Sequence, residues 1–311
     1  MSDLRIIGTY SQDVFGPLVV ITGAIHGNEP AGVLAIQQVL DILNHLPAHV
    51  TFKGKMVGLI GHYAAFKKQI RFFKHDLNRL WEKTRVEQAL TECDAGCTED
   101  EEELAALFQI IRRKVRAYHP EKLIVLDLHT TSAEDGLFSI PTDEKASLEL
   151  AKALHVPVVL KLFDNVQGTL LRFSVEGGFA AGTGYPKETL GVAFEAGKHT
   201  DPRAAERCAG AILSALQWGG CLPSDLLLPD SVEHLRADGA CLPKVVSLHS
   251  VHHIQPEDEF KMRPGYRNFQ PVRRGEHLAD DKNGPVLSSV DGYILMPLYQ
   301  KLGHEGFFLV R

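Results

Sequence analysis

The stretch GPLVVITGAIHGNEPAG, residues 16–32, begins as a buried strand and ends as the start of a helix. Its apolar run Leu18–Ile21 is typical of a short strand that is covered on both faces. Glycines bound the turn that follows, and Pro30 lies where a helix tolerates proline, in its first turn. This order of strand, turn and helix predicts an α/β fold, with the turn at the edge of the sheet.

The same alternation continues to about residue 222. Helical periodicity and short apolar runs predict helices over residues 30–46, 98–118 and 201–217, and strands at 55–61, 122–132, 157–163 and 190–197. We therefore predict a first domain, residues 1–222, with a mixed, mostly parallel sheet flanked by helices. The turn-rich sequence that follows, with its short alternating runs, predicts a smaller β-rich C-terminal domain, residues 223–311.

An acidic run, Glu99–Glu103, opens the helix predicted over residues 98–118. Thr98 and Glu101 have the spacing of a capping box. Acidic side chains at the start of a helix are also favoured by the helix macrodipole. We therefore interpret this run as a helix start rather than as a cation site.

The composition excludes several classes of function. A formal charge of −6 gives no basic footprint for nucleic acid or an anionic membrane, so we expect a small-molecule substrate. The N-terminal sequence is unlike a signal peptide, and no apolar run approaches the roughly 18 residues of a membrane span, which predicts a cytoplasmic protein. The five cysteines are odd in number and scattered, which argues against a disulfide framework.

Three potential metal ligands follow two of the predicted strands. His26 and Glu29 lie in the turn after the first strand, and His129 lies in LDLHTTS at the end of another. Strand ends are where reactive groups collect in an open α/β sheet, so these side chains are expected to meet. Two imidazole nitrogens and one carboxylate form a three-ligand zinc shell with a fourth position for water. The sequence thus predicts one catalytic Zn²⁺ per chain.

Asp127 lies two residues before His129 on the same strand. Because strand side chains alternate, both should point to the same face of the sheet. Asp127 could then orient the imidazole through the nitrogen that does not bind the metal. A hydrogen bond to backbone at the strand end is the alternative.

Two competing metal hypotheses involve other residues. Cys93 and Cys97 could form half of a zinc site, but no second pair lies at a suitable spacing. His249, His252 and His253 could bind zinc or nickel, but we identify no carboxylate that would support them. We favour a strand and loop for this histidine cluster.

Two arginines and a glutamate complete the candidate site. Arg71 precedes the motif HDLNRLW, and Arg79 lies within it. A guanidinium group can bind a carboxylate bidentately or stabilise charge on an attacked carbonyl, although for Arg79 an ion pair with Asp76 is the alternative. Glu195 follows an apolar strand, where it could accept a proton from a water activated by the metal. A surface pair with Lys198 is the alternative for Glu195.

Four motifs together carry a family resemblance. GAIHGNEPAG, HDLNRLW, LDLHTTS and FEAGKH resemble the aspartoacylase and succinylglutamate desuccinylase family of zinc amidohydrolases, which are related to the zinc carboxypeptidases. The motifs occur in the family's order and span residues 18 to about 200, and the β-rich tail is similar to the family's C-terminal domain. The resemblance implies a zinc carboxypeptidase-like catalytic domain that cleaves the amide bond of an N-acyl amino acid.

The resemblance also implies a role for each matching residue. His26, Glu29 and His129 would bind zinc, and Glu195 would be the general acid and base. The remaining roles would be carbonyl polarisation by Arg71 and binding of the substrate's carboxylate by Asn78 and Arg79. Tyr299 matches a C-terminal tyrosine that reaches into the family's active site, with a packed tyrosine as the alternative.

One departure from the family concerns the substrate. Aspartoacylase carries a further arginine about ten residues before its catalytic glutamate, where this chain has Tyr185. No arginine lies between Arg172 and Glu195, so we expect weaker selection for an acidic substrate, unless Lys187 or Arg172 substitutes. The alternative functions are a metallocarboxypeptidase acting on peptides and a non-catalytic binding protein on the same fold. The intact Glu195 argues against the second of these.

Overall fold

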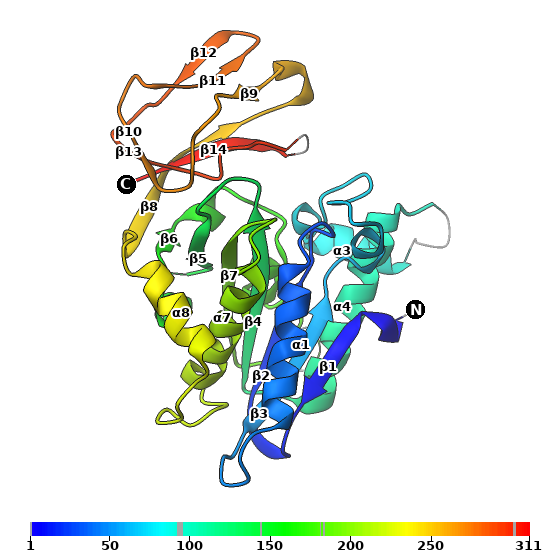
Figure 1. Cartoon of the computed structure of the whole chain (residues 1–311). Helices are drawn as coiled ribbons and strands as arrows, with labels where there is room; N and C mark the ends of the chain where they lie inside the picture. The colour runs from blue at the N-terminus through cyan, green and yellow to red at the C-terminus, as the bar shows by residue number, and fades with distance from the viewer. Residues whose placement is uncertain (1, 92–95, 144, 181, 183, 301–302) are drawn as a thin grey trace.

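The computed structural model describes residues 2–91, 96–143, 145–180, 182, 184–300 and 303–311. One large sheet runs through the molecule, with helices covering its first part and a smaller β unit at its far end (Figure 1). The predicted α/β fold with a smaller β-rich C-terminal part is confirmed.

Eleven strands of the described chain form the large sheet. Their spatial order is β1 (Ile6–Tyr10), β3 (Lys53–Ile60), β2 (Val14–Gly23), β4 (Lys122–Thr131), β7 (Glu188–Lys198), β5 (Leu137–Pro141), β6 (Val158–Leu160), β8 (Val245–His253), β14 (Glu305–Val310), β13 (Gly292–Leu295) and β10 (Gln270–Val272). The central strands β3, β2, β4 and β7 are parallel to one another. A second, antiparallel sheet consists of β12 (Gly284–Leu287), β11 (His277–Asp281) and β9 (Lys261–Met262).

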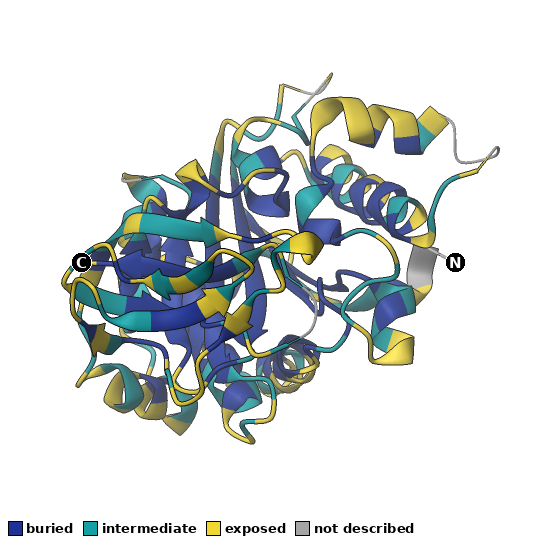
Figure 2. Cartoon of the chain, turned by 90° about the horizontal axis from the view of Figure 1, so that it is seen from above, coloured by how far each residue is buried: buried dark blue, intermediate teal, exposed yellow. Residues whose placement is uncertain are grey.

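Helices cover both faces of the central strands. They are α1 (Ala31–Asn44), α2 (Tyr63–Lys68), α3 (Lys83–Thr91), α4 (Glu99–Tyr118), α5 (Ala146–Ala153), α6 (Leu170–Val175), α7 (Ala204–Trp218) and α8 (Asp230–Gly239). Alternate residues of β2 belong to two different cores: Leu18 and Val20 pack with α4, whereas Val19 and Ile21 pack with α1 and α7. Figure 2 shows the result, with buried strands inside and helices exposed on their outer sides.

The register of the central strands determines which side chains meet. Thr22 on β2 lies opposite Asp127 on β4, and His129 further along β4 lies opposite Glu195 on β7. The turn that carries His26 follows β2 directly. The carboxyl ends of three parallel strands therefore bring the predicted residues to one edge of the sheet.

The C-terminal region is hydrogen-bonded into the same sheet. β8 pairs with β6 through Val158 and Val245 at one end, and it pairs with β14 along most of its length. Helix α8 packs its buried Val232 and Leu235 into the core beneath α7. The domain boundary between residues 222 and 223 stays a prediction.

Several elements differ from the sequence expectations. Only Val158–Leu160 of the predicted strand 157–163 is extended, because Lys161 has a left-handed φ of 64° that turns the chain into a 3-10 helix. Strand β5 is an additional buried strand, and α8 is a helix in a region predicted to be β-rich. Helix α4 begins as predicted, since Thr98 and Glu101 form the capping box.

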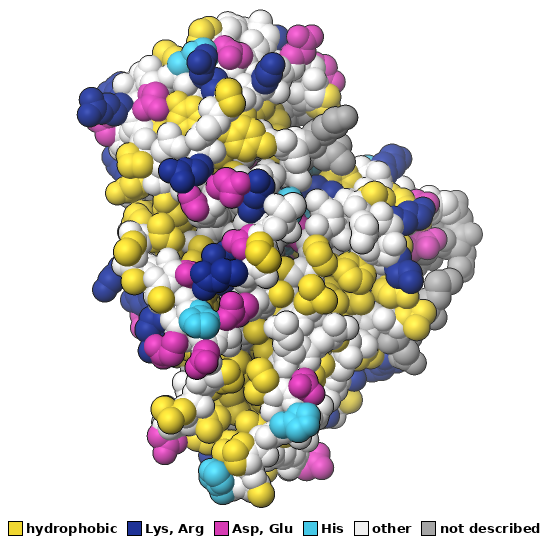
Figure 3. Space-filling view, in the orientation of Figure 1, with side chains coloured by type: hydrophobic (Ala, Val, Ile, Leu, Met, Phe, Trp, Pro, Cys, Tyr) yellow, Lys and Arg dark blue, Asp and Glu magenta, His cyan; other side chains and the backbone are white. Residues whose placement is uncertain are grey.

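The surface carries no broad area of one charge on the face shown in Figure 3, where basic and acidic side chains are interspersed. Among the described residues, every helix is too short or too polar to span a bilayer.

Gly27 illustrates how tightly the turn after β2 is packed. A Cβ atom at this position would lie 2.2 Å from the backbone carbon of Ala65 and 2.3 Å from the backbone nitrogen of Phe66. Backbone atoms of α2 cannot rotate away from this Cβ as the end of a side chain could. We therefore expect Gly27→Ala to lower the free energy of unfolding by about 2–3 kcal/mol or more. Chemical denaturation would measure this loss.

Gly8→Ala is the matched control for this prediction. Its Cβ would meet Cδ1 of Leu40 at 2.5 Å, and a side-chain end can rotate away. Equal losses in the two variants would contradict the proposed backbone contact.

Candidate active site

His26, Glu29 and His129 form the centre of the candidate site. Glu29 lies between the two imidazoles: its Oε1 is 2.9 Å from His26 Nδ1, and its Oε2 is 3.3 Å from His129 Nδ1. All three side chains are buried, and their ligand atoms lie within 4.8 Å of one another. Within the described part of the chain, this is the one group of three such side chains that could hold a metal ion.

A second carboxylate contacts the outer nitrogen of each imidazole. His26 Nε2 lies 3.2 Å from Asp76 Oδ1, and His129 Nε2 lies 2.8 Å from Asp127 Oδ2. The predicted contact between Asp127 and His129 is thus present in the structure. From the sequence, Asp76 was expected only as a partner for Arg79. Its contact with His26 was not predicted, although both residues lie in the quoted motifs.

The hydrogen-bonding capacity of the two imidazoles tests whether a cation fits here. A neutral imidazole has one N–H, yet each ring has carboxylate oxygens at both nitrogens. Either each ring carries an additional proton, or a cation lies on the Nδ1 side while Nε2–H donates outward. The second arrangement is the usual one for histidine ligands. Two nitrogens and one carboxylate therefore suit a zinc-type cation.

Electrostatics around Glu29 follow from this packing. Burial raises the pKa of Glu29, but His26 and His129 outweigh it and hold that pKa well below its usual value. Burial likewise lowers the pKa of His129, but Asp127 and Glu29 raise it well above the usual value. The site thus favours a charged carboxylate that faces positive charge.

Arg71 lies beside the same carboxylates. Its Nη1 donates to Glu29 at 3.2 Å and its Nη2 to Asp76 at 3.4 Å. The backbone oxygen of Arg71 also accepts a hydrogen bond from Gly27 N, which ties its loop to the turn after β2. Arg71 is therefore positioned at the trio, as the sequence analysis expected.

Asp100 holds the loop that carries Arg71 and Asp76. Its carboxylate accepts backbone hydrogen bonds from residues 73, 74 and 75 at 2.8–3.0 Å, and it contacts His62 Nε2 at 2.9 Å. Burial raises the pKa of Asp100, but these hydrogen bonds lower it to about 2. One residue of the acidic run at the start of α4, Asp100, thus holds the loop at residues 73–75, in addition to its favourable interaction with the helix macrodipole. This loop contact was not predicted from the sequence.

Glu195 enters the site from β7. Its side chain is buried, and Oε2 has no hydrogen-bond partner within the described structure. Burial raises the pKa of Glu195 to about 7, against the opposing effect of His129. A buried carboxyl group with such a pKa can exchange protons near neutral pH, as a general acid and base requires.

Asn78 is occupied by structural contacts. Its Nδ2 donates to Asp127 at 3.4 Å, and its Oδ1 accepts from the backbone N–H of Leu170 at 3.0 Å. The side chain is buried and supports Asp127 from behind. The contact of Asn78 with a substrate carboxylate stays a prediction.

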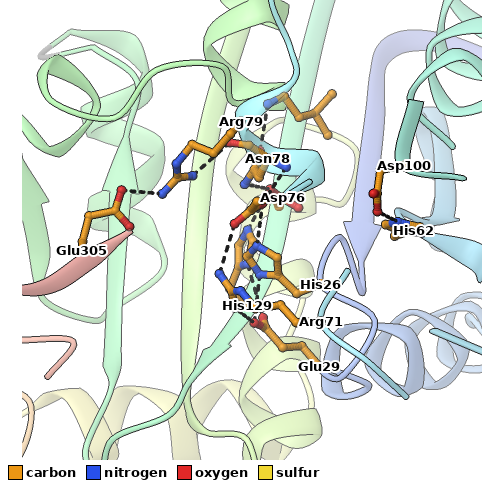
Figure 4. A network of polar contacts seen from close by, with 12 residues as sticks. His26, Glu29, His62, Arg71, Asp76, Asn78, Arg79, Asp100, His129 and Glu305 are labelled. Carbon is orange, nitrogen blue, oxygen red and sulfur yellow. Dashed lines mark hydrogen bonds and ion pairs between the residues drawn. The ribbon is translucent and has the colours of Figure 1, made fainter. Parts of the chain in front are cut away.

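Arg79 and Tyr299 both contact residues of the C-terminal region. Arg79 Nη2 is 2.9 Å from Glu305 Oε1, which is its ion-pair partner (Figure 4). The Asp76 of the alternative interpretation acts on Arg79 through its charge, which raises the pKa of the guanidinium. The hydroxyl group of Tyr299 donates to backbone oxygens of Arg263 and Tyr266 in the C-terminal region. The structure does not bring Tyr299 to the metal ligands.

A cavity of about 90 Å³ opens at the trio. Its described lining includes Arg71, Glu195 and Glu305, together with His199, which the sequence analysis quoted in FEAGKH without assigning a role. His199 Nδ1 is 2.7 Å from the hydroxyl group of Thr130, and its Nε2 is buried without a partner in the described structure. A larger cavity of about 540 Å³ lies beside Trp81, but none of the trio lines it. We therefore take the smaller cavity, which the potential metal ligands line, as the candidate active site.

The competing metal hypotheses gain no support. His252 stacks on Phe307 with ring centroids 5.1 Å apart, as a packed strand residue would. Cys93 lies outside the described residues, and Cys97 is disulfide-bonded and so not available as a thiolate ligand. The odd, scattered cysteines therefore do not exclude every disulfide, although Cys208, Cys221 and Cys241 are free.

The sequence that forms this site matches the model of one protein family. Residues 15–204 match the model of the succinylglutamate desuccinylase/aspartoacylase catalytic domain. That range contains the trio, both outer carboxylates, both arginines and Glu195, and it covers more than half of the chain. No curated protein sequence matches the chain.

Solved structures with the same fold are similar over nearly the whole chain. The product-bound ectoine utilization protein EutE (DoeB) from Ruegeria pomeroyi is 17% identical with a TM-score of 0.64, covering 97% of this chain and 86% of that one. A succinylglutamate desuccinylase from Vibrio cholerae is 17% identical with a TM-score of 0.59, covering 96% and 82%. A succinylglutamate desuccinylase/aspartoacylase from Rhodobacter sphaeroides is 16% identical with a TM-score of 0.60, covering 96% and 86%. At these identities the likeness shows the fold.

We expect one divalent cation to bind per chain, and His129→Ala to lose it while keeping its fold. Asp127→Asn leaves the ligands in place but removes the carboxylate that orients His129, so cation affinity should fall by about 10–100-fold. Metal analysis and competition with a chelator would measure both effects.

His45→Ala is the control for these metal-binding measurements, because His45 is exposed and its ion-pair partner in the described structure is Asp41. Full metal occupancy in His129→Ala would refute the ligand assignment.

Glu195 should make the stability of the metal-free protein depend on pH. Its pKa rises from 4.5 to about 7 on folding, so the folded state favours the neutral acid. Stability is therefore lost as pH rises from about 4.5 through 7. The shift corresponds to roughly 3 kcal/mol above pH 7. Glu195→Gln removes this loss, so it should stabilise the metal-free protein far more at pH 8 than at pH 5.

Denaturant titrations of the metal-free proteins at the two pH values would test this difference. A pH-independent effect of Glu195→Gln would mean that the carboxylate is solvated rather than buried.

Proposed function

The chain belongs to the succinylglutamate desuccinylase/aspartoacylase family of hydrolases, and we propose that it hydrolyses the amide bond of an N-acyl amino acid with one bound Zn²⁺. The products would be a carboxylic acid and a free amino acid. The observation that carries the proposal is the convergence of His26, Glu29, His129 and Glu195 on one cavity.

The cofactor and the base have separate tasks. His26, Glu29 and His129 would hold the zinc ion, which when bound would act as a Lewis acid and lower the pKa of water to about 7. Glu195 takes the proton that the attacking water gives up and then returns a proton to the leaving amine nitrogen. Its buried, unpartnered Oε2 supports this role, because nothing in the described structure competes for the proton.

Arg71 is the group that we assign to the substrate carbonyl. Its guanidinium lies beside Glu29 at the edge of the cavity, with its side chain 16% exposed. As the carbonyl carbon becomes tetrahedral, negative charge develops on its oxygen, and a fixed guanidinium donor stabilises that charge. The ion pairs with Glu29 and Asp76 hold the donor in place before the substrate arrives.

Arg79 is our proposed anchor for the substrate's α-carboxylate. A guanidinium group has five N–H donors, and the contacts given for Arg79 use one nitrogen for Glu305 and another for the carbonyl of Asn78. Asn78 would contribute by holding Asp127 and the start of α6, since both its amide atoms are already bonded.

The size of the cavity favours a small substrate over a peptide. A volume of about 90 Å³ is below the 300–1,000 Å³ of common ligand pockets, so a tripeptide would require extensive opening. This observation favours an N-acyl amino acid hydrolase over the metallocarboxypeptidase alternative.

We expect the zinc-loaded protein to hydrolyse at least one N-acetyl, N-succinyl or N-formyl amino acid with a higher kcat/KM than a tripeptide. Glu195→Gln should retain the metal and lose about 10²–10⁴-fold in kcat, because the amide cannot accept the proton. Steady-state assays with metal content measured in parallel would test both expectations.

Glu188→Gln is the matched control, because Glu188 begins the same strand and is exposed at its opposite end. A tripeptide as the best substrate would establish the peptidase alternative. Wild-type turnover in Glu195→Gln would remove Glu195 from the mechanism.

A further inference from the structure

Glu305 reaches the candidate active site from the C-terminal region. It is the first residue of β14, where it lies opposite His253 of β8. Its side chain is among the described residues that line the cavity at the trio, and it is 14% exposed. Figure 4 shows its contact with Arg79, with the trio below Arg79 in this view. The substrate pocket thus contains a carboxylate that the catalytic-domain motifs do not predict.

Each described guanidinium group in and around this cavity already has a carboxylate partner. Arg71 lies between the carboxylates of Glu29 and Asp76. Arg79 lies 2.9 Å from Glu305. Burial lowers the pKa of Arg79, but the negative charges of Asp76 and Glu305 outweigh it and leave that pKa raised. Within the described lining, no guanidinium or ammonium group lacks a carboxylate partner.

The basic side chains considered as substitutes for the missing arginine lie elsewhere. Arg172 donates to Glu176 and to the carbonyl of Phe163. The Nζ of Lys187 lies 5.0 Å from the ring centroid of Tyr185. Neither side chain is part of the described cavity lining.

We propose that Glu305 is a specificity-determining residue that excludes N-acyl amino acids with a carboxylate side chain. The inference rests on the proposed function and names its substrate class: amino acids with neutral or cationic side chains. The ion pair between Arg79 and Glu305, whose side chain lines the cavity at the trio, carries it.

The physical reason is the number of carboxylates that would surround Arg79. A neutral substrate would bring its α-carboxylate beside Glu305, whereas an acidic substrate would bring a second carboxylate as well. Arg79 has enough donors to bind an α-carboxylate while it keeps Glu305. A second substrate carboxylate would then lie near Glu305 with no remaining cation in the described lining. Like charges in a partly buried site repel strongly, and such repulsion is a common device for rejecting the wrong partner.

A pair of isosteric substrates tests this directly. We would compare kcat/KM for N-acyl glutamate, glutamine and lysine, using the acyl group that the wild type cleaves fastest. The wild type should prefer glutamine to glutamate by about 10–100-fold and accept lysine at least as well as glutamine. Glu305→Gln frees the charge of Arg79, so the preference for glutamine over glutamate should shrink by at least about 10-fold, mainly through KM.

Binding measured without turnover provides a second readout. Calorimetry in the Glu195→Gln background should give the same change in the glutamine-to-glutamate ratio of Kd when Glu305→Gln is added. Glu305→Ser repeats the test with a shorter side chain, in case the glutamine amide forms its own contact with Arg79. Glu257→Gln is the matched control, because it removes one exposed carboxylate from the same region.

The outcomes separate the two proposals. Turnover with an unchanged ranking in Glu305→Gln and Glu305→Ser would overturn the role of Glu305 while leaving the hydrolase in place. An equal gain for all three substrates would also overturn it, because Glu305 would then merely compete with the α-carboxylate. Failure of the wild type to cleave any N-acyl amino acid would overturn the proposed function, and this inference with it.

Discussion

The buried carboxylate of Glu29 is the constraint on which the rest of the site depends. A carboxylate that is only 1% exposed must face positive charge or hydrogen-bond donors, and Glu29 is surrounded by two imidazoles, the Arg71 guanidinium and the backbone N–H of Thr130. Each imidazole in turn contacts Asp76 or Asp127. Carboxylates and nitrogen-bearing side chains therefore alternate outward from Glu29 through two layers.

This alternation explains why distant parts of the chain have to be placed accurately. Asp127 is fixed by Thr22 and Asn78, and Asp76 lies on a loop whose neighbouring backbone is held by Asp100 from α4. Asp100 is itself paired with His62, the N-cap of α2, and α2 packs against Gly27 in the ligand turn. The contacts form a closed path around the metal ligands, so a change in one element moves its neighbours.

Sequence reasoning located the parts of the site that depend on local rules. The ligands His26 and Glu29 follow a strand at a Gly-bounded turn, and Asp127 and His129 share a face because strand side chains alternate. Groups recruited over long distances were not found in this way. The contact between Arg79 and Glu305 spans 226 residues, and that between His26 and Asp76 spans 50, so no periodicity or motif spacing reports them. Strand β6 was predicted too long for a different reason, since the left-handed backbone of Lys161 leaves no clear mark in an apolar run.

The shared sheet also limits how the molecule can admit a ligand. β8 is hydrogen-bonded to β6 on one side and to β14 on the other, so the two regions form one mechanical unit. A clamshell motion would have to break the ladder between β6 and β8 and leave unpaired backbone groups at both new edges. Entry must therefore depend on rotamer changes and on short loops at the rim of the cavity. Such movements occur in picoseconds to microseconds, which makes slow domain opening a poor explanation for any rate-limiting step.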